Sequence, residues 1–175
     1  MNTKKVFYKG PLMVVYIINK LNEFYPNKSI GKTAIQKLTY LFVRKLNDPN
    51  HILNYDFSLH YYGPYSDELS STIDFAESKG LIDIRWEDKK GYIIQSRREQ
   101  FEELEENEKE LLDEVVQEYG NYGRVIDISI VATAFYVKDK YDVPDDELPA
   151  SIENLKPELD LDYIKKVLLK YGITK

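Results

Sequence analysis

A strand, a sharp corner and the start of a helix follow one another within residues 55–69, and this order constrains the fold more than any other segment. Apolar and polar side chains alternate over residues 55–62, which is the period of a half-buried strand. Gly63 and Pro64 are expected to end the strand, because proline has no N–H for a ladder and glycine tolerates a bend. Ser66 is the expected N-cap of the next helix. The segment therefore predicts a rigid corner of tyrosines between a strand and a helix.

Helices are predicted wherever apolar residues recur at steps of three and four. The expected helices cover residues 11–25, 32–47, 66–79, 98–118, 126–140 and 160–171. The first is expected to begin at Pro11, since proline suits the first turn of a helix. Residues 81–86 and 91–95 flank a polar tip and predict a β-hairpin. Residues 144–157 are polar and are expected to form a turn-rich connection.

The order helix, helix, strand, helix, hairpin is that of a winged-helix unit. We therefore expect an α+β fold that is mainly α, with a winged-helix-like unit over residues 1–97. A helical C-terminal extension over residues 98–175 is expected to pack on this unit, so that the chain forms a single compact domain. Many unrelated functions share this order of elements, so it predicts a shape and little else.

Composition excludes several classes of function. The chain has no cysteine and two histidines, which excludes disulfides, thiol nucleophiles and His-rich or thiolate metal sites. No apolar run reaches the roughly 18–20 residues that span a bilayer. Asp56, Ser58 and His60 lie side by side on one strand rather than in the mutual geometry of a catalytic triad. We expect a cytoplasmic protein without cofactor, metal or membrane partner, and not an enzyme; an enzyme of unknown class is a weaker candidate.

Charge is distributed unevenly along the chain. Residues 1–47 hold nine Lys and Arg and one acid, Glu23, whereas residues 48–175 hold fifteen Lys and Arg and twenty-nine acids. Such asymmetry is typical of a basic surface for an anionic partner. It is equally expected if two parts of one domain attract each other, and this second interpretation is slightly favoured.

DNA binding is the alternative function that a winged helix suggests. Its usual reading helix would be residues 66–79, but four acids and one lysine make that segment repel phosphate. DNA binding therefore stays possible only if the protein docks through helix 32–47 and the hairpin over residues 81–95. Its candidate contact residues are Lys32, Lys37, Arg44, Lys89, Lys90, Arg97 and Arg98. These cations could equally form a solvated face or pair with the acidic helix 98–118.

A family resemblance involves two short motifs. Residues 31–41, with Gln36-Lys37-Leu38-Thr39-Tyr40, are followed at a distance by Tyr62-Gly63-Pro64. This pair of motifs resembles the Panacea domain, which occurs in Soc-type antitoxins and in small, mostly uncharacterised bacterial, archaeal and phage proteins. Many members have Trp where this chain has Tyr62, and the well-formed hairpin over residues 81–95 makes the chain look nearer to the YwgA-like branch than to the antitoxins proper.

The resemblance implies a non-enzymatic protein that binds another protein, as an antitoxin-like or adaptor module. The implied partner is a toxin or a protein passed to a protease, and a homodimer is left open. Carried over to this sequence, the motif positions are Lys37, Tyr40, Tyr62, Gly63 and Pro64. Tyr61 and Tyr65 complete the candidate partner-binding surface, because rigid aromatics on a turn suit recognition. The alternative is structural: Tyr40 packs against the corner, and Gly-Pro only sets its bend.

Overall fold

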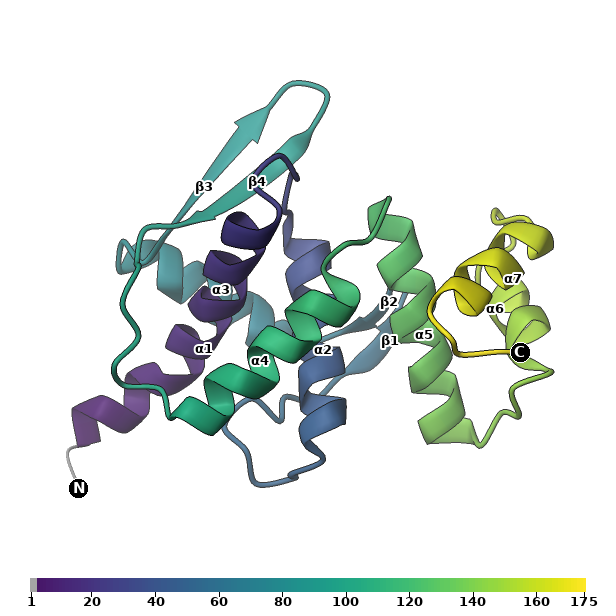
Figure 1. The fold of residues 1–175 in the computed structure, drawn as a ribbon, viewed down its shortest axis with the longest axis horizontal. Coiled ribbons are helices and arrows are strands. Elements are labelled where there is room, and N and C mark those ends of the chain that lie inside the picture. The colour runs from purple at the N-terminus through teal and green to yellow at the C-terminus, as the bar shows by residue number, and fades with distance from the viewer. Residues whose placement is uncertain (1–2) are drawn as a thin grey trace.

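The computed structural model describes residues 3–175, with side chains from Tyr8 onward, and these residues form seven helices and two β-hairpins (Figure 1). The helices are α1 (Thr3–Phe24), α2 (Lys32–Leu46), α3 (Asp67–Ser78), α4 (Glu106–Tyr119), α5 (Val125–Tyr141), α6 (Leu148–Leu155) and α7 (Leu161–Lys170). The strands are β1 (Ser58–His60), β2 (Gly63–Tyr65), β3 (Ile82–Glu87) and β4 (Gly91–Ser96). The prediction of an α+β, mainly helical fold is confirmed.

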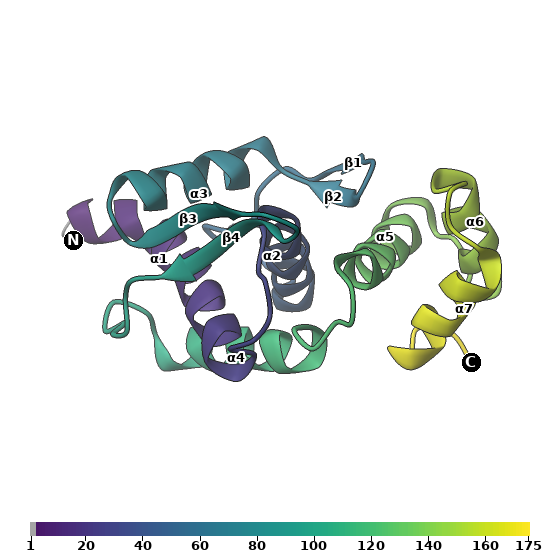
Figure 2. The same ribbon diagram turned by 90° about the horizontal axis from the view of Figure 1, so that it is seen from above.

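Two helices form the centre of the molecule. Residues 12–18 of α1 and 127–134 of α5 are buried without interruption, which is the pattern of a helix covered on all sides. Helix α1 packs against α2, α3, α4 and β4, and α5 packs against α2, β2, α6 and α7. Figure 2 shows α5 between the larger group of elements and the pair α6–α7, with the two chain ends at opposite ends of the molecule.

Two predicted helix starts were wrong, and one helix was not predicted. Helix α1 begins at Thr3, and Pro11 lies inside it, where a proline removes one backbone hydrogen bond of the helix. Helix α4 begins at Glu106 rather than residue 98, because the preceding connection has its own anchors in buried Phe101 and Leu104. Helix α6 occupies part of the segment that was expected to be a turn-rich connection. Its apolar residues are too few to show a helical period against the polar background.

The corner has a different geometry from the one expected. Gly63 and Pro64 do not end a strand; they belong to β2, which pairs antiparallel with β1 across a two-residue turn at Tyr61 and Tyr62. Proline is tolerated there because both strands of a two-stranded sheet are edge strands, so the missing N–H need not break a ladder. The expected alternation of exposed and partly covered side chains is present over residues 55–60.

The order of elements is compatible with a winged-helix-like unit, which stays a prediction. The hairpins β1–β2 and β3–β4 form two separate sheets, so β1 does not join the longer hairpin. Helix α4 packs against both α1 and α2, so residues 98–175 contribute to the same core as residues 1–97. No helix in residues 3–175 is long and apolar enough to cross a membrane.

The acidic helix α4 is paired within the chain. Lys45 of α2 lies 3.1 Å from Glu114 and 3.2 Å from Glu118, and Lys9 of α1 lies 2.6 Å from Glu108. These contacts connect the basic N-terminal segment with the acidic part of the chain. They bear out the interpretation that the charge asymmetry reflects attraction between two parts of one domain.

Candidate functional site

The turn of the β1–β2 hairpin presents two aromatic side chains to solvent. Tyr61 and Tyr62 are 61% and 50% exposed, and their rings meet edge to face with centroids 4.8 Å apart. We call this pair the tyrosine tip. The hairpin that carries it lies between α2 and α5, and both helices contact β2 (Figure 2). The tip is therefore an exposed apolar feature on a backbone that is held from both sides.

Gly63 sets how closely the hairpin approaches α5. Its φ of +93° lies in a region that side chains other than hydrogen disfavour. A Cβ at this position would lie 2.5 Å from Thr133 Oγ1 and 3.2 Å from the Ser129 carbonyl oxygen. Only glycine therefore allows β2 to pack directly on the backbone of α5, and Pro64 beside it is buried as well.

Two buried lysines hold the main chain around the tip. Lys37 of α2 donates from Nζ to the Pro64 carbonyl oxygen at 2.7 Å, and Lys156, just after α6, donates to the carbonyl oxygen of Tyr61. Burial, with a smaller contribution from the positive charge of Lys156, lowers the pKa of Lys37 to about 7. Burial also lowers the pKa of Lys156, which the negative charge of Glu158 partly offsets. The two ammonium groups fix the turn from both ends.

The end of the hairpin is tied to the start of α3. Gln36 Nε2 donates to the Ser66 carbonyl oxygen at 2.9 Å, and the Ser66 N–H donates to Gln36 Oε1 at 3.0 Å. Ser66 Oγ accepts from the Leu69 N–H at 3.3 Å, which confirms Ser66 as the N-cap of α3. Tyr65 is half-buried and stacks on His60 with ring centroids 4.8 Å apart. These contacts make the connection from strand to helix rigid.

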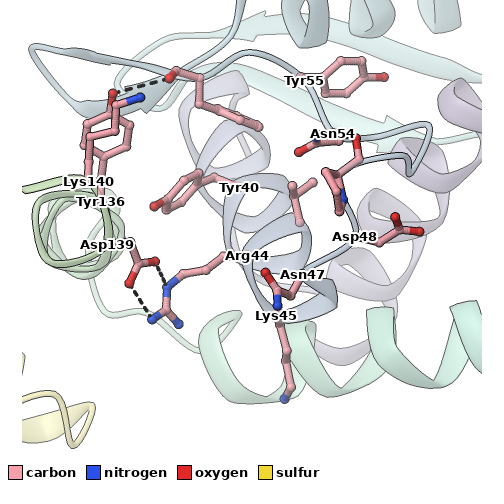
Figure 3. Close-up of a pocket in the computed structure, with 13 residues that line it drawn as sticks. Tyr40, Arg44, Lys45, Asn47, Asp48, Asn54, Tyr55, Tyr136, Asp139 and Lys140 are labelled. Atoms are coloured by element: carbon pink, nitrogen blue, oxygen red, sulfur yellow. Dashed lines mark hydrogen bonds and ion pairs between the residues drawn. The ribbon is translucent and has the colours of Figure 1, made fainter.

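Tyr40 lies behind the site, next to an open groove of about 800 Å³ (Figure 3). Its ring contacts Phe57 and Tyr136, with centroid distances of 5.3 and 6.1 Å. Burial raises the pKa of the Tyr40 phenol far above its usual value. Arg44 Nη2 donates to Asp139 Oδ1 at 3.1 Å across the same groove, so its charge is compensated. Tyr40 thus packs α2 against α5 rather than facing solvent.

The candidate partner-binding residues separate into two groups. Tyr61 and Tyr62 are exposed, Lys37, Tyr40, Gly63 and Pro64 are buried behind them, and the half-buried Tyr65 lies between the two groups in exposure. The buried group positions the exposed group. Sequence reasoning missed Gln36 and Lys156 as supports of the hairpin, and Thr133 as the α5 residue that Gly63 approaches. For Lys156 no signal existed, because its partner Tyr61 is distant in sequence and the contact is to a main-chain oxygen.

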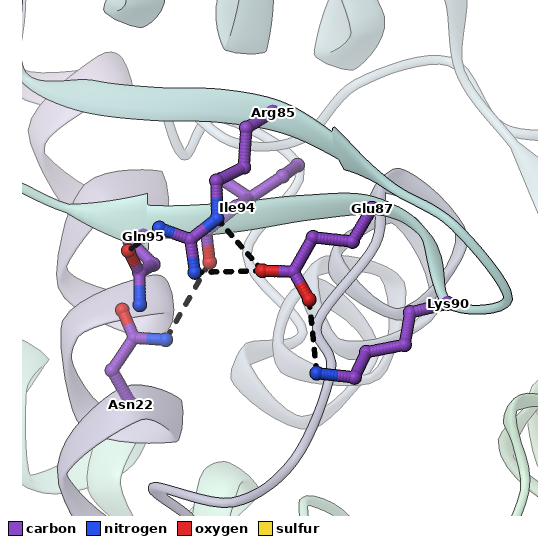
Figure 4. Close-up of polar contacts among 6 residues, drawn as sticks. All are labelled: Asn22, Arg85, Glu87, Lys90, Ile94 and Gln95. Carbon is purple, nitrogen blue, oxygen red and sulfur yellow. Dashed lines mark hydrogen bonds and ion pairs between the residues drawn. The ribbon is translucent and has the colours of Figure 1, made fainter.

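Most of the cations that were candidates for DNA contacts have acidic partners in the chain. Those partners are Asp74 for Lys32, Asp139 for Arg44, Glu87 for Lys90, Asp83 for Arg97 and Glu103 for Arg98. Figure 4 shows Glu87 between Arg85 and Lys90 near the end of the β3–β4 hairpin. Lys37 has no acidic partner either but is buried, so Lys89 is the one exposed candidate without an acidic partner in the described part of the chain.

The pairing of these cations with acids predicts that the protein binds DNA weakly and that its affinity depends only slightly on salt concentration. Each phosphate that a protein neutralises adds about −0.9 to the slope of log K against log salt, and one unpaired cation supports a slope of roughly −1. Fluorescence anisotropy with a labelled duplex at several salt concentrations measures that slope. A slope steeper than about −4 would show that the ion pairs open on DNA and would restore the DNA-binding alternative.

Comparison with models of known protein families and with curated proteins found no match. The resemblance to the Panacea domain therefore stays a prediction that depends on residues 31–41 and Tyr62-Gly63-Pro64. Within residues 3–175, no group of three or more His, Asp and Glu side chains is arranged to hold a metal ion.

Proposed function

We propose that this protein recognises another protein through the tyrosine tip. The observation that carries the proposal is a pair of exposed aromatic rings on a hairpin turn whose backbone is held by two buried lysines. Tyrosine is enriched among the residues that dominate binding energy at protein interfaces. Because the turn is already ordered, little conformational entropy is lost when a partner covers it.

The kind of partner follows from the resemblance, as part of the same proposal. An antitoxin-like or adaptor module binds a toxin or a protein destined for a protease, and it needs a recognition surface rather than a reaction centre. The tyrosine tip is such a surface. The acidic face of α4 is less suited to this role, because Lys9 and Lys45 already pair with it. The cations proposed for DNA are likewise compensated, which disfavours the transcription-regulator alternative.

Replacing both tyrosines of the tip with alanine is expected to weaken partner binding about thirtyfold or more while leaving the fold intact. Truncating an aromatic anchor at the centre of an interface costs roughly 2 kcal/mol or more, which weakens affinity about thirtyfold. Exposed positions outside the core change stability by only about 0.5 kcal/mol. Quantitative affinity purification from source cells identifies the partners, and titration calorimetry with the purified partner then measures the loss for Tyr61→Ala/Tyr62→Ala.

The β3–β4 hairpin offers a matched control. Trp86 and Tyr92 are 62% and 59% exposed, and their rings also meet edge to face, at 5.1 Å. The variant Trp86→Ala/Tyr92→Ala is expected to keep every partner that the wild type binds. Retention of all partners by the Tyr61→Ala/Tyr62→Ala variant, or their loss from the control variant alone, would contradict the proposal.

A further inference from the structure

A small pocket of about 280 Å³ lies directly beside the tyrosine tip. Its lining residues come from the first turns of α2, the β1–β2 hairpin and the start of α3: Lys32, Thr33, Gln36, Lys37, His60, Tyr61, Tyr62, Tyr65 and Ser70. Gln36 and Lys37 are buried and form the inner wall, whereas His60 and the tyrosine tip are exposed and form the rim. The pocket therefore lies between the exposed tip and the buried residue Lys37.

The lining is cationic in a chain that is acidic. The protein carries thirty Asp and Glu, yet none of them lines this pocket, which is lined by two lysines. The N-terminus of α2 lies here, and no side chain caps it, because the N-cap position is Gly31. The partial positive charge of a helix N-terminus favours an anion. The charge, the dipole and the hydroxyl groups of Thr33 and Ser70 suit a negatively charged ligand, whereas the Tyr61 hydroxyl at the rim is already engaged by Glu158.

Lys37 supplies the specific observation. Its side chain is 2% exposed, and one main-chain oxygen, that of Pro64 at 2.7 Å, is its hydrogen-bond acceptor, although an ammonium group has three N–H bonds. Within the described residues no carboxylate lies at ion-pair distance, and the neighbouring charge that acts on it is the positive Lys156. A buried charge without a counter-ion is unfavourable. A bound anion would provide the missing counter-ion.

The available charge selects a monoanion. Lys32 already pairs with Asp74 at 2.7 Å, and Lys156 does not line the pocket. One uncompensated ammonium group therefore remains for the ligand, which balances one carboxylate rather than a phosphate dianion. The pocket is also smaller than the usual range of about 300–1,000 Å³ for small-molecule sites, so it accepts a side chain more readily than a whole metabolite.

We propose that this pocket is a carboxylate-binding site in which Lys37 is the counter-ion and the tyrosine tip forms the rim. The carboxylate is that of an Asp or Glu side chain on the protein that the tip recognises, and this source rests on the proposed function. The tip then provides aromatic contact area for the partner. The pocket selects partners that have an acidic residue next to the segment that contacts the tip.

N-acetyl-glutamate amide, a capped glutamate side chain, is the probe, and its uncharged glutamine analogue is the matched control ligand. Amide NMR spectra recorded at constant ionic strength, with ligand up to about 50 mM, are expected to show saturable shifts at Thr33, Lys37 and Tyr62 with the glutamate compound alone. The Lys37→Met variant is expected to weaken binding at least tenfold. Lys28→Met is the control variant, because Lys28 also donates to a carbonyl oxygen, that of Tyr122, but lies outside the pocket.

Direct titration of the Lys37 ammonium group in the wild type gives a second measurement that needs no variant. Its pKa is expected to rise when the glutamate compound binds and to stay unchanged with the glutamine compound, because only a negative charge stabilises the ammonium form. Equal shifts with both compounds, no saturable shift, or undiminished binding by a folded Lys37→Met variant would overturn the carboxylate site. Acetate that binds tenfold more tightly than the capped glutamate would overturn the proposed source of the carboxylate, because the ligand would then be a free small acid rather than a protein side chain.

The two proposals fail in distinguishable ways. If the capped glutamate does not bind but the Tyr61→Ala/Tyr62→Ala variant loses its partner, the tip recognises a protein without the pocket. If the capped glutamate binds and the tip variant keeps every partner, the pocket is a carboxylate site whose ligand is not supplied by a protein docked on the tip.

Discussion

Gly63→Ala is expected to lower the free energy of unfolding by about 2–5 kcal/mol, because backbone strain and overpacking add at this position. A residue with a Cβ is strained at a φ of +93° by roughly 1–2 kcal/mol. The added Cβ would also lie 2.5 Å from Thr133 Oγ1, and such overpacking costs about 1–3 kcal/mol. Urea unfolding followed by circular dichroism measures the difference.

Gly80→Ala separates backbone strain from overpacking. Gly80 also has a positive φ, +68°, but a Cβ there would meet no atom within 4 Å. This variant is expected to show only the strain contribution, about 1–2 kcal/mol. Adding Thr133→Ala to Gly63→Ala should recover part of the loss, because Thr133 Oγ1 is the closest atom. If Gly63→Ala and Gly80→Ala lose equal stability, the close packing of β2 on α5 is not what requires glycine.

Lys37→Met is expected to change how stability depends on pH. In the wild type the pKa of Lys37 is lowered from 10.5 to about 7, mainly by burial and also by Lys156. Between these values the unfolded chain binds more protons than the folded one, so raising the pH stabilises the wild type. The methionine variant lacks this group. Its stability relative to the wild type should therefore be highest near pH 6 and should fall by about 3 kcal/mol by about pH 9.5.

The comparison between variants isolates Lys37 from other titrating groups. Lys156 and Glu158, the other charges at this end of the hairpin, are unchanged in Lys37→Met, so their effects largely cancel in the difference. Leaving the Pro64 carbonyl oxygen without its donor lowers the variant's stability by about 1 kcal/mol at every pH and does not alter the slope. Unfolding in urea at several pH values gives the difference directly. A pH-independent difference would mean that the Lys37 ammonium is solvated as in the unfolded chain.

Local signals in the sequence predicted most of the elements but not all of their ends. The amphipathic period of α2 and the polar tip between β3 and β4 are properties of neighbouring residues, so both elements were predicted within one or two residues. The start of α1 was predicted wrongly, because Pro11 is a start signal only when tertiary burial does not extend the helix past it. The short helix α6 was missed, because its few apolar residues are buried by packing against α5, which the local sequence does not show.

The same distinction applies to the site. The motif around Lys37 and the Gly63-Pro64 pair were identified from the sequence, and so was a turn rich in tyrosines. The sequence did not predict which of these residues are exposed to solvent. The charged side chain of Lys37 and the ring of Tyr61 could each have been buried or exposed. Packing of α5 on β2 and of the segment after α6 on the turn buries the lysines and leaves the tip exposed.

The sequence by itself determined the α+β class, the order of the elements other than β2 and α6, the N-cap at Ser66 and the tyrosine-rich turn, because each depends on periods and preferences of adjacent residues. Only the tertiary structure decided that Gly63 touches α5, that α4 pairs with Lys9 and Lys45, and that Lys37 is buried without a carboxylate. The physical reason is that desolvation and close packing are set by residues that are far apart in the chain and meet only when it folds.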